Sequence, residues 1–101
     1  MIIVSGKAKL SPGGLQKVQK EMETLIAATR AETGCIEYSF GADVTEPDTL
    51  VILEYWESWA ALDAHVKQPH MGVWFAKLGE IGVVSQAIRF IEAGEERNLM
   101  G

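Results

Sequence analysis

Two histidines stand five residues apart in the stretch HVKQPHMGVWF, which covers residues 65–75. Histidine titrates near neutral pH, so a side chain of this type can act as a general base. His65 precedes Pro69, which ends its helix, so the imidazole can lean over a sheet edge; we expect it to be the catalytic base. His70 begins the next helix, where the helix dipole disfavours its protonated form, and this position favours packing or capping. A partly buried His65 that bonds a backbone carbonyl is the alternative interpretation.

The spacing of these histidines does not match a metal-binding motif. In H-E-x-x-H a four-residue step places both ligands on one helical face, whereas here the step is five and Pro69 intervenes. A site formed by His65, His70 and Asp63 is therefore disfavoured. The glycines form no G-x-G-x-x-G motif, phosphate loop or G-x-S-x-G elbow. We expect neither a metal nor an organic cofactor.

Aromatic and acidic side chains accompany the first histidine. Trp74 and Phe75 share one face of the second short helix, and Trp56 ends the preceding strand. Each of them either lines a cavity or fills the core. Glu54 lies in the otherwise apolar stretch TLVILEYW, and a buried carboxylate needs a partner. Lys7, on the polar face of the first strand, is the candidate partner.

Four segments have the pattern of β-strands. Residues 2–10 and 35–43 alternate apolar and polar side chains, which is typical of strands covered on one side. Residues 49–56 are apolar on both faces, so this strand is predicted to be central and covered on both sides. Residues 83–92 form the last strand, and the turn at 45–48 makes a hairpin of the second and third strands.

Helical segments separate these strands. Ser11 and Pro12 have the types of an N-cap and a first helical residue, and the amphipathic helix that follows ends at Gly34. Ser58 caps a short helix that Pro69 ends, and a second short helix runs from about residue 70 to residue 78. The order β-α-β-β-α-β, with the second helix split, predicts a ferredoxin-like α+β fold with helices on one face of an antiparallel sheet.

Length and composition set further limits. The 101 residues predict one domain over residues 1–93 and a polar tail over 94–101. The formal charge of −5 argues against nucleic-acid binding, and no apolar run approaches the roughly 18 residues of a membrane span. A single cysteine, Cys35, excludes an intramolecular disulfide and fits a cytoplasmic location. The uncovered apolar face of the sheet predicts a homodimer.

The stretches ETGCIEYSF and EPDTLVILEYWESWAALDAHVKQPH resemble, in their order and spacing, the antibiotic biosynthesis monooxygenase family. Its members typically carry E-x-G-C/N-x-x-Y on the second strand, then E-x-W/Y-x-S/D, a short helix ending in A-x-H, and a Pro-His pair. The resemblance covers residues 2–92 and implies a dimeric α+β barrel. His65 and His70 stand at the A-x-H and Pro-His positions.

The family includes cofactor-free oxygenases of quinols and polyketide phenols, haem-degrading enzymes, and an isomerase of a phosphorylated ketone. Haem degraders resemble one another in an Asn-Trp-His set, where this chain has Lys7, His65 and Phe75, so haem degradation is disfavoured. The resemblance implies a quinol-monooxygenase-like enzyme that oxidises a small quinol or phenol with molecular oxygen, His65 accepting the proton. The residues expected to contact the substrate are Lys7, Trp56, His70, Trp74 and Phe75.

Two alternative functions stay open at this point. An isomerase of a small phosphorylated ketone would need cations in the pocket, so Lys7, Lys77 or Arg89 would have to point inward. A non-catalytic dimer that binds a small molecule would fit a pocket filled by its own tryptophans.

Overall fold

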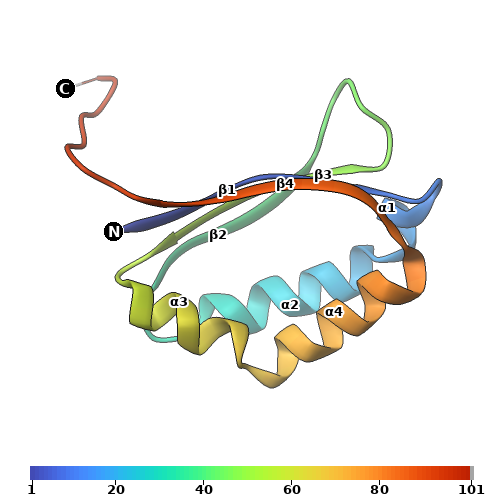
Figure 1. Ribbon diagram of the computed structural model, residues 1–101, viewed down its shortest axis with the longest axis horizontal. Helices are drawn as coiled ribbons and strands as arrows, with labels where there is room; N and C mark the ends of the chain where they lie inside the picture. The colour runs from blue at the N-terminus through green and yellow to red at the C-terminus, as the bar shows by residue number, and fades with distance from the viewer. Residues whose placement is uncertain (101) are drawn as a thin grey trace.

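The computed structural model describes residues 1–100 and shows a four-stranded antiparallel sheet with helices on one face (Figure 1). The strand order is β2-β3-β1-β4. In chain order the elements are β1 (Ile2–Leu10), α1 (Gly14–Lys17), α2 (Gln19–Arg30), β2 (Cys35–Ala42), β3 (Thr49–Trp56), α3 (Trp59–Val66), α4 (Pro69–Ile81) and β4 (Val83–Glu92). The predicted ferredoxin-like α+β fold, with its split second helix, is confirmed.

The strand register places one alternating set of side chains under the helices. Val4 of β1 lies opposite Glu54 of β3 and Phe90 of β4, so these three side chains share the helix-covered face. The buried residues of β1 are the alternating set that the sequence predicted: Ile2, Val4, Ala8 and Leu10. Their burial fixes the register, because a slip of one residue would expose all of them.

The third strand is central, as predicted, but helices cover only one of its faces. Leu50, Ile52 and Trp56 face the helices and are buried. Val51, Leu53 and Tyr55 point to the other face and are only half-buried. The predicted cover on both sides is therefore not supplied by the helices of one chain.

The first helix begins differently from the prediction. Ser11 is not its cap, because the Ser11 hydroxyl donates instead to the carbonyl of Gly82 (3.3 Å). The cap is Gly13, with a φ of 77°, and the N–H groups of Gly13 and Leu15 donate to the carboxylate of Asp48 at 2.9 and 3.4 Å. Asp48 comes from the β2–β3 turn and stabilises the positive end of the helix, a contact that only the fold creates.

The helical layer is also divided at other points than expected. Val18 interrupts the first helix, and Gly34, with a φ of 87°, lies in the turn after α2. Ser58 caps α3 as predicted, its Oγ accepting from the N–H of Ala61 (3.1 Å). Pro69 is the first residue of α4, which runs on past the predicted end to Ile81, before Gly82.

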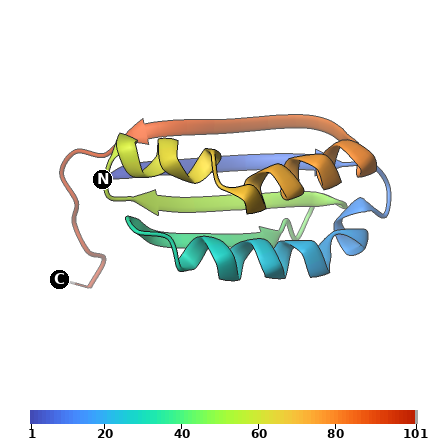
Figure 2. The ribbon, with the colours of Figure 1, turned by 90° about the horizontal axis from the view of Figure 1, so that it is seen from below.

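The two sets of helices cover different parts of the sheet. α2 runs along the β2 side, while α3 and α4 run along the β1 and β4 side (Figure 2). β4 is mostly exposed. Residues 93–100 carry no helix or strand and leave the sheet at one end (Figure 1); Gly101 of the predicted tail lies outside the described residues. No helix within residues 1–100 has the length and apolar character to cross a membrane.

Candidate active site

His65 is held in the last turn of α3 against the helix-covered face of the sheet. Its ring lies 4.6 Å from the ring of Trp56 and 5.3 Å from that of Tyr38, measured between centroids. All three side chains are buried. Contacts on two sides fix the orientation of the imidazole, and this is the rigidity that a positioned base requires.

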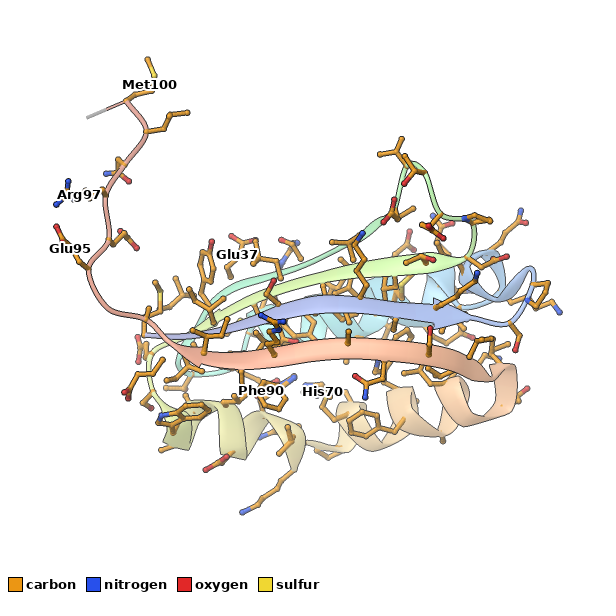
Figure 3. The ribbon with its side chains drawn as sticks, turned by 45° about the horizontal axis from the view of Figure 1, so that its top comes forward. Glu37, His70, Phe90, Glu95, Arg97 and Met100 are labelled. Atoms are coloured by element: carbon orange, nitrogen blue, oxygen red, sulfur yellow. The ribbon has the colours of Figure 1, made fainter. Side chains whose placement is uncertain are left out.

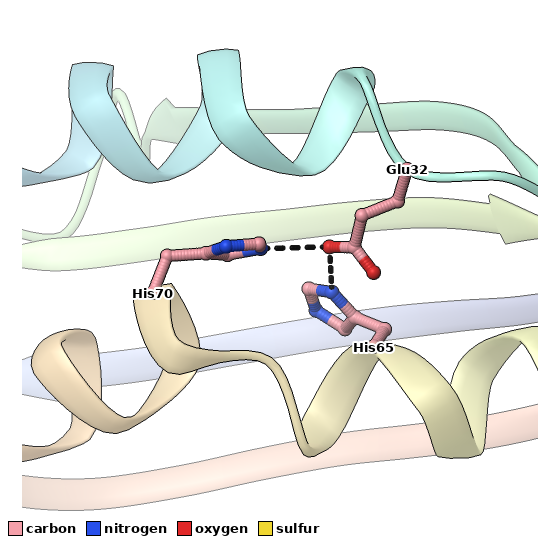
Figure 4. Close-up of side chains that lie close together, drawn as sticks. All are labelled: Glu32, His65 and His70. Atoms are coloured by element: carbon pink, nitrogen blue, oxygen red, sulfur yellow. Dashed lines mark hydrogen bonds and ion pairs between the residues drawn. The ribbon is translucent and has the colours of Figure 1, made fainter.

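One carboxylate oxygen joins the two histidines. Oε2 of Glu32 lies 2.7 Å from Nδ1 of His65 and 2.8 Å from Nε2 of His70 (Figure 4). Glu32 stands in the turn between α2 and β2, and the histidines come from α3 and α4. Side-chain exposure rises along this chain of bonds, from 2% at His65 through 11% at Glu32 to 22% at His70. The cluster therefore runs from the core towards the surface.

This bonding determines which nitrogen of His65 can accept a proton. A carboxylate oxygen accepts, so Nδ1 of His65 carries the hydrogen and donates to Glu32. Nε2 is buried and has no hydrogen-bond partner among residues 1–100. Burial lowers the pKa of His65, while the hydrogen bond with Glu32 acts in the opposite direction. A neutral imidazole with a free Nε2 lone pair is the form that a general base needs.

His65 lines a cavity of about 320 Å³ between the sheet and the two C-terminal helices. The apolar side chains dominate its lining, and the polar lining residues within the described chain are Tyr38, Glu54, His65 and Gln86. Phe75 and Phe90 also line it and are 54% and 59% exposed, so the cavity opens to solvent between α4 and β4. Figure 3 shows Phe90 on the helix side of β4. An apolar cavity with few polar groups is typical of small-molecule sites.

Glu54 adds a second titratable group to this cavity. The carboxyl lies on β3 and is buried, and its Oε1 accepts a hydrogen bond from Nε1 of Trp56 (2.8 Å). Burial raises the pKa of Glu54 to about 7, while the bond from Trp56 lowers it. The predicted pairing of Glu54 with Lys7 is wrong. Lys7 projects from the opposite face of β1, where its Nζ lies 2.6 Å from the carboxylate of Asp43.

The structure separates the residues that the sequence grouped as substrate contacts. Trp74 and Phe75 line the cavity together with His65. Trp56 lies behind His65 as a buried support, and His70 lies outside the cavity lining, on Glu32. Lys7 is on the uncovered face of the sheet and does not line the cavity.

The cations that an isomerase of a phosphorylated ketone would use are also outside this cavity. Lys77 lies 3.7 Å from Glu21 and 3.8 Å from Glu80. Arg89 pairs with Ser5 in the register, on the uncovered face of the sheet. Neither side chain belongs to the cavity lining.

Glu32, His65 and His70 offer one oxygen and two nitrogens within 4.8 Å of one another, which are ligand types that zinc uses. The contacts of 2.7 and 2.8 Å are hydrogen-bond lengths. Ligands of a tetrahedral zinc, each about 2.0–2.1 Å from the metal, stand about 3.3 Å apart. In this structure the three side chains form a hydrogen-bonded cluster. Asp63, the third ligand considered from the sequence, is exposed elsewhere on α3.

Sequence reasoning did not identify Glu32 or Tyr38 as site residues. Both lie in the stretch ETGCIEYSF. The available signal was that this stretch matches the family pattern E-x-G-C/N-x-x-Y, in which they are the Glu and the Tyr. A larger hollow of about 510 Å³ lies between α1, α2 and the β2–β3 hairpin, and its lining includes neither histidine nor Glu54. The candidate catalytic residues therefore line the cavity beside His65 and not this larger hollow.

Comparisons with known proteins agree with this fold. Residues 1–77 match the model of the family described as antibiotic biosynthesis monooxygenase. A relative in Escherichia coli, named probable quinol monooxygenase YgiN, is 28% identical over 104 residues, covering 93% of this chain and 99% of its own. A crystal structure from Deinococcus radiodurans superposes with a TM-score of 0.90 at 29% identity over the full length of both chains. The solved structure of Rv0793 from Mycobacterium tuberculosis superposes with a TM-score of 0.84 at 26% identity, covering 96% of this chain and 98% of its own.

Proposed function

The chain belongs to the antibiotic biosynthesis monooxygenase family, and we propose that it oxidises a small quinol or phenol with molecular oxygen, without a cofactor. One observation carries the proposal: the buried His65 lines an apolar cavity, Glu32 holds its Nδ1–H, and its Nε2 has no hydrogen-bond partner within residues 1–100. The name of the Escherichia coli relative, probable quinol monooxygenase, supports this choice of substrate.

The chemistry begins with one proton transfer. Nε2 of His65 takes the hydroxyl proton of a hydroquinone, and the Glu32 carboxylate stabilises the resulting imidazolium. The electron-rich anion then passes one electron to oxygen, and the two radicals combine as a peroxide on a ring carbon. In the overall balance one hydroquinone and one dioxygen give one hydroxyquinone and one water, so the protein supplies only proton transfer, orientation and exclusion of bulk solvent.

The walls of the cavity fit this requirement. Trp74 and Phe40 have ring centroids 6.1 Å apart, and Trp74, Phe40 and Phe75 all line the cavity. Aromatic faces of this kind hold a flat ring in place and keep water from the reactive anion. Trp74 and Phe75 are therefore proposed as substrate contacts, whereas Trp56 and His70 act through His65 and Glu32. Lys7, on the other face of the sheet, contacts no ligand in this cavity.

The experiment is oxygen uptake by metal-free protein with a panel of mono- and bicyclic hydroquinones. We expect substrate-dependent uptake that His65→Gln lowers by a factor of about 100 to 10,000. Asp63→Asn, on the exposed side of the same helix, is the control and should retain the wild-type rate. Absence of uptake by the wild-type protein with every quinol would contradict the proposal.

We also propose that the protein is a homodimer joined through the uncovered face of its sheet. Val51, Leu53 and Tyr55 are half-buried there, and Ile91 is 43% exposed. A second copy would supply the cover for β3 that the helices of one chain do not give.

A further inference from the structure

We propose that Glu54 is a second catalytic group, a general acid that protonates the leaving oxygen when the substrate peroxide breaks down. This inference rests on the proposed monooxygenase function and assigns the step that follows the action of His65. Both side chains line the same cavity, and they reach it from different elements, β3 and α3.

The surroundings of Glu54 orient its carboxyl for such a role. Nε1–H of Trp56 donates to Oε1, and no other hydrogen bond to the Glu54 side chain occurs within residues 1–100. Oε2 is therefore free to carry a proton and donate it to a molecule in the cavity. The same Trp56 ring lies against His65 in a tilted contact, so one side chain touches both the base and the acid.

The environment favours a protonated carboxyl at Glu54. Apolar side chains surround it in the cavity, and the tryptophan is a neutral partner, not a cation. The titratable groups that line the cavity with Glu54 are His65 on α3 and Tyr38 on β2. The carboxylate of Glu54 in turn raises the pKa values of Tyr38 and of Cys35 on the same strand, and Glu32 in the turn after α2 acts on Glu54 itself. The nearby Glu32 carboxylate further disfavours ionisation of Glu54.

The proton balance of the reaction calls for an acid as well as a base. After oxygen addition, the peroxide anion takes the proton held by His65 and becomes a hydroperoxide on a ring carbon. His65 then removes the hydrogen of that carbon as the O–O bond breaks and the new C=O bond forms. The leaving hydroxide takes the proton of Glu54 and departs as water, and the imidazolium returns a proton to Glu54. Quinol and oxygen are thereby converted to hydroxyquinone and water with both groups regenerated.

Glu54→Gln is the decisive variant, because glutamine keeps the shape and the bond from Trp56 but supplies no acid. With a hydroquinone that the wild type oxidises, we expect water-forming turnover to fall about 100-fold. Oxygen uptake should instead yield unhydroxylated quinone and hydrogen peroxide, one of each for every quinol and dioxygen consumed. Glu57→Gln, an exposed carboxylate at the end of the same strand, is the control. Unchanged product ratios in the Glu54 variant would overturn the proposal.

A binding measurement tests the acid even without turnover. The bicyclic ketone 1-tetralone, monitored by tryptophan fluorescence from pH 5.5 to 8.5, probes hydrogen-bond donation to a carbonyl in the cavity. We expect its affinity for the wild type to fall about tenfold as pH rises through about 7, and its affinity for Glu54→Gln to be flat. A flat profile in the wild type would overturn the role of Glu54. Lack of quinol oxidation alongside a pH-dependent profile would count against the monooxygenase function instead.

Discussion

At the scale of single residues, the site depends on a carboxylate that accepts from two histidines. Glu32 fixes the Nδ1–H form of His65, and the bond from His70 holds the same oxygen in place. Side chains that orient a histidine base in this way determine its proton affinity as well as which ring nitrogen accepts the proton. His70, expected from the sequence to pack or to cap a helix, bonds through its ring to Glu32, and we therefore propose that it is a positioning residue.

Glu32→Gln tests this positioning role. The charge of Glu32 raises the pKa of His65, so its removal should lower that pKa and move the acid limb of the pH–rate profile to lower pH. Turnover should fall about 10- to 100-fold because the imidazolium loses its counter-charge. ¹⁵N NMR of the histidine rings should show a mixture of tautomers at His65. The exposed Glu23→Gln on α2 is the control, and an acid limb that stays in place would contradict the assignment.

The pKa of Glu54 predicts a pH-dependent stability. Its value in the folded protein, about 7, lies above its ordinary value of 4.5, so the folded state binds more protons between these limits. The free energy of unfolding should therefore fall as pH rises from about 4.5 to 7, by an amount on the order of 3 kcal/mol. Urea denaturation of the wild type and Glu54→Gln checks this, since the variant should lack that contribution and be the more stable protein at pH 8. Parallel profiles for the two proteins would refute it.

At the scale of elements, the site exists because three helix ends meet. The turn after α2 delivers Glu32, the last turn of α3 delivers His65, and the first turn of α4 delivers His70. Gly34 allows this approach, because a Cβ at that position would lie 2.6 Å from Cβ of Ala61 on α3. The positive φ of Gly34 also disfavours any side chain.

Gly34→Ala should therefore disturb both stability and activity. The left-handed backbone and the contact with α3 together should lower the free energy of unfolding by about 2 kcal/mol or more. Because α3 carries His65, turnover should fall together with the free energy of unfolding. Gly79→Ala is the matched control: nothing lies within 4 Å of its Cβ position on α4, and alanine there should stabilise by about 0.5–1 kcal/mol. Denaturant melts of both variants decide the question, and equal stabilities would refute it.

At the scale of the whole molecule, the chain buries one face of its sheet and leaves the other uncovered, with the apolar side chains of Val51, Leu53 and Tyr55 on its central strand β3. Helices lie on one side of the sheet in Figure 1, and no element among residues 1–100 packs on the other. A protein of about 100 residues buries only about 60–70% of its unfolded surface, so cover for this face contributes to stability.

Leu53→Lys tests assembly through this face. The wild type should sediment at about twice the chain mass of 11.1 kDa at about 10 µM, and the variant should sediment as a monomer because a lysine there would be buried without a partner. Far-ultraviolet circular dichroism should confirm that the variant remains folded. Glu80→Lys, exposed on α4, should leave the dimer intact. A wild-type monomer at this concentration would contradict the proposed homodimer.

The sequence by itself determined the order of elements, the face that β1 buries and the break at Pro69. These features follow from local patterns: alternation every two residues, a proline at a helix start, and a serine cap at Ser58. Its motifs were also sufficient to indicate the family. The prediction from local patterns erred at Ser11 and at the pairing of Lys7, where partners come from distant parts of the chain.

Only the tertiary structure decided which of these residues form a site. Glu32 and His65 are 33 positions apart, and the 2.7 Å contact between them depends on how α2 and α3 pack on the sheet. Glu54 became a candidate acid because folding placed it in an apolar cavity beside a tryptophan. Lys7 is no longer a candidate substrate contact, because strand alternation turns its side chain to the other face of the sheet. Burial and proximity set the pKa and the partner of each group, and no local pattern encodes them.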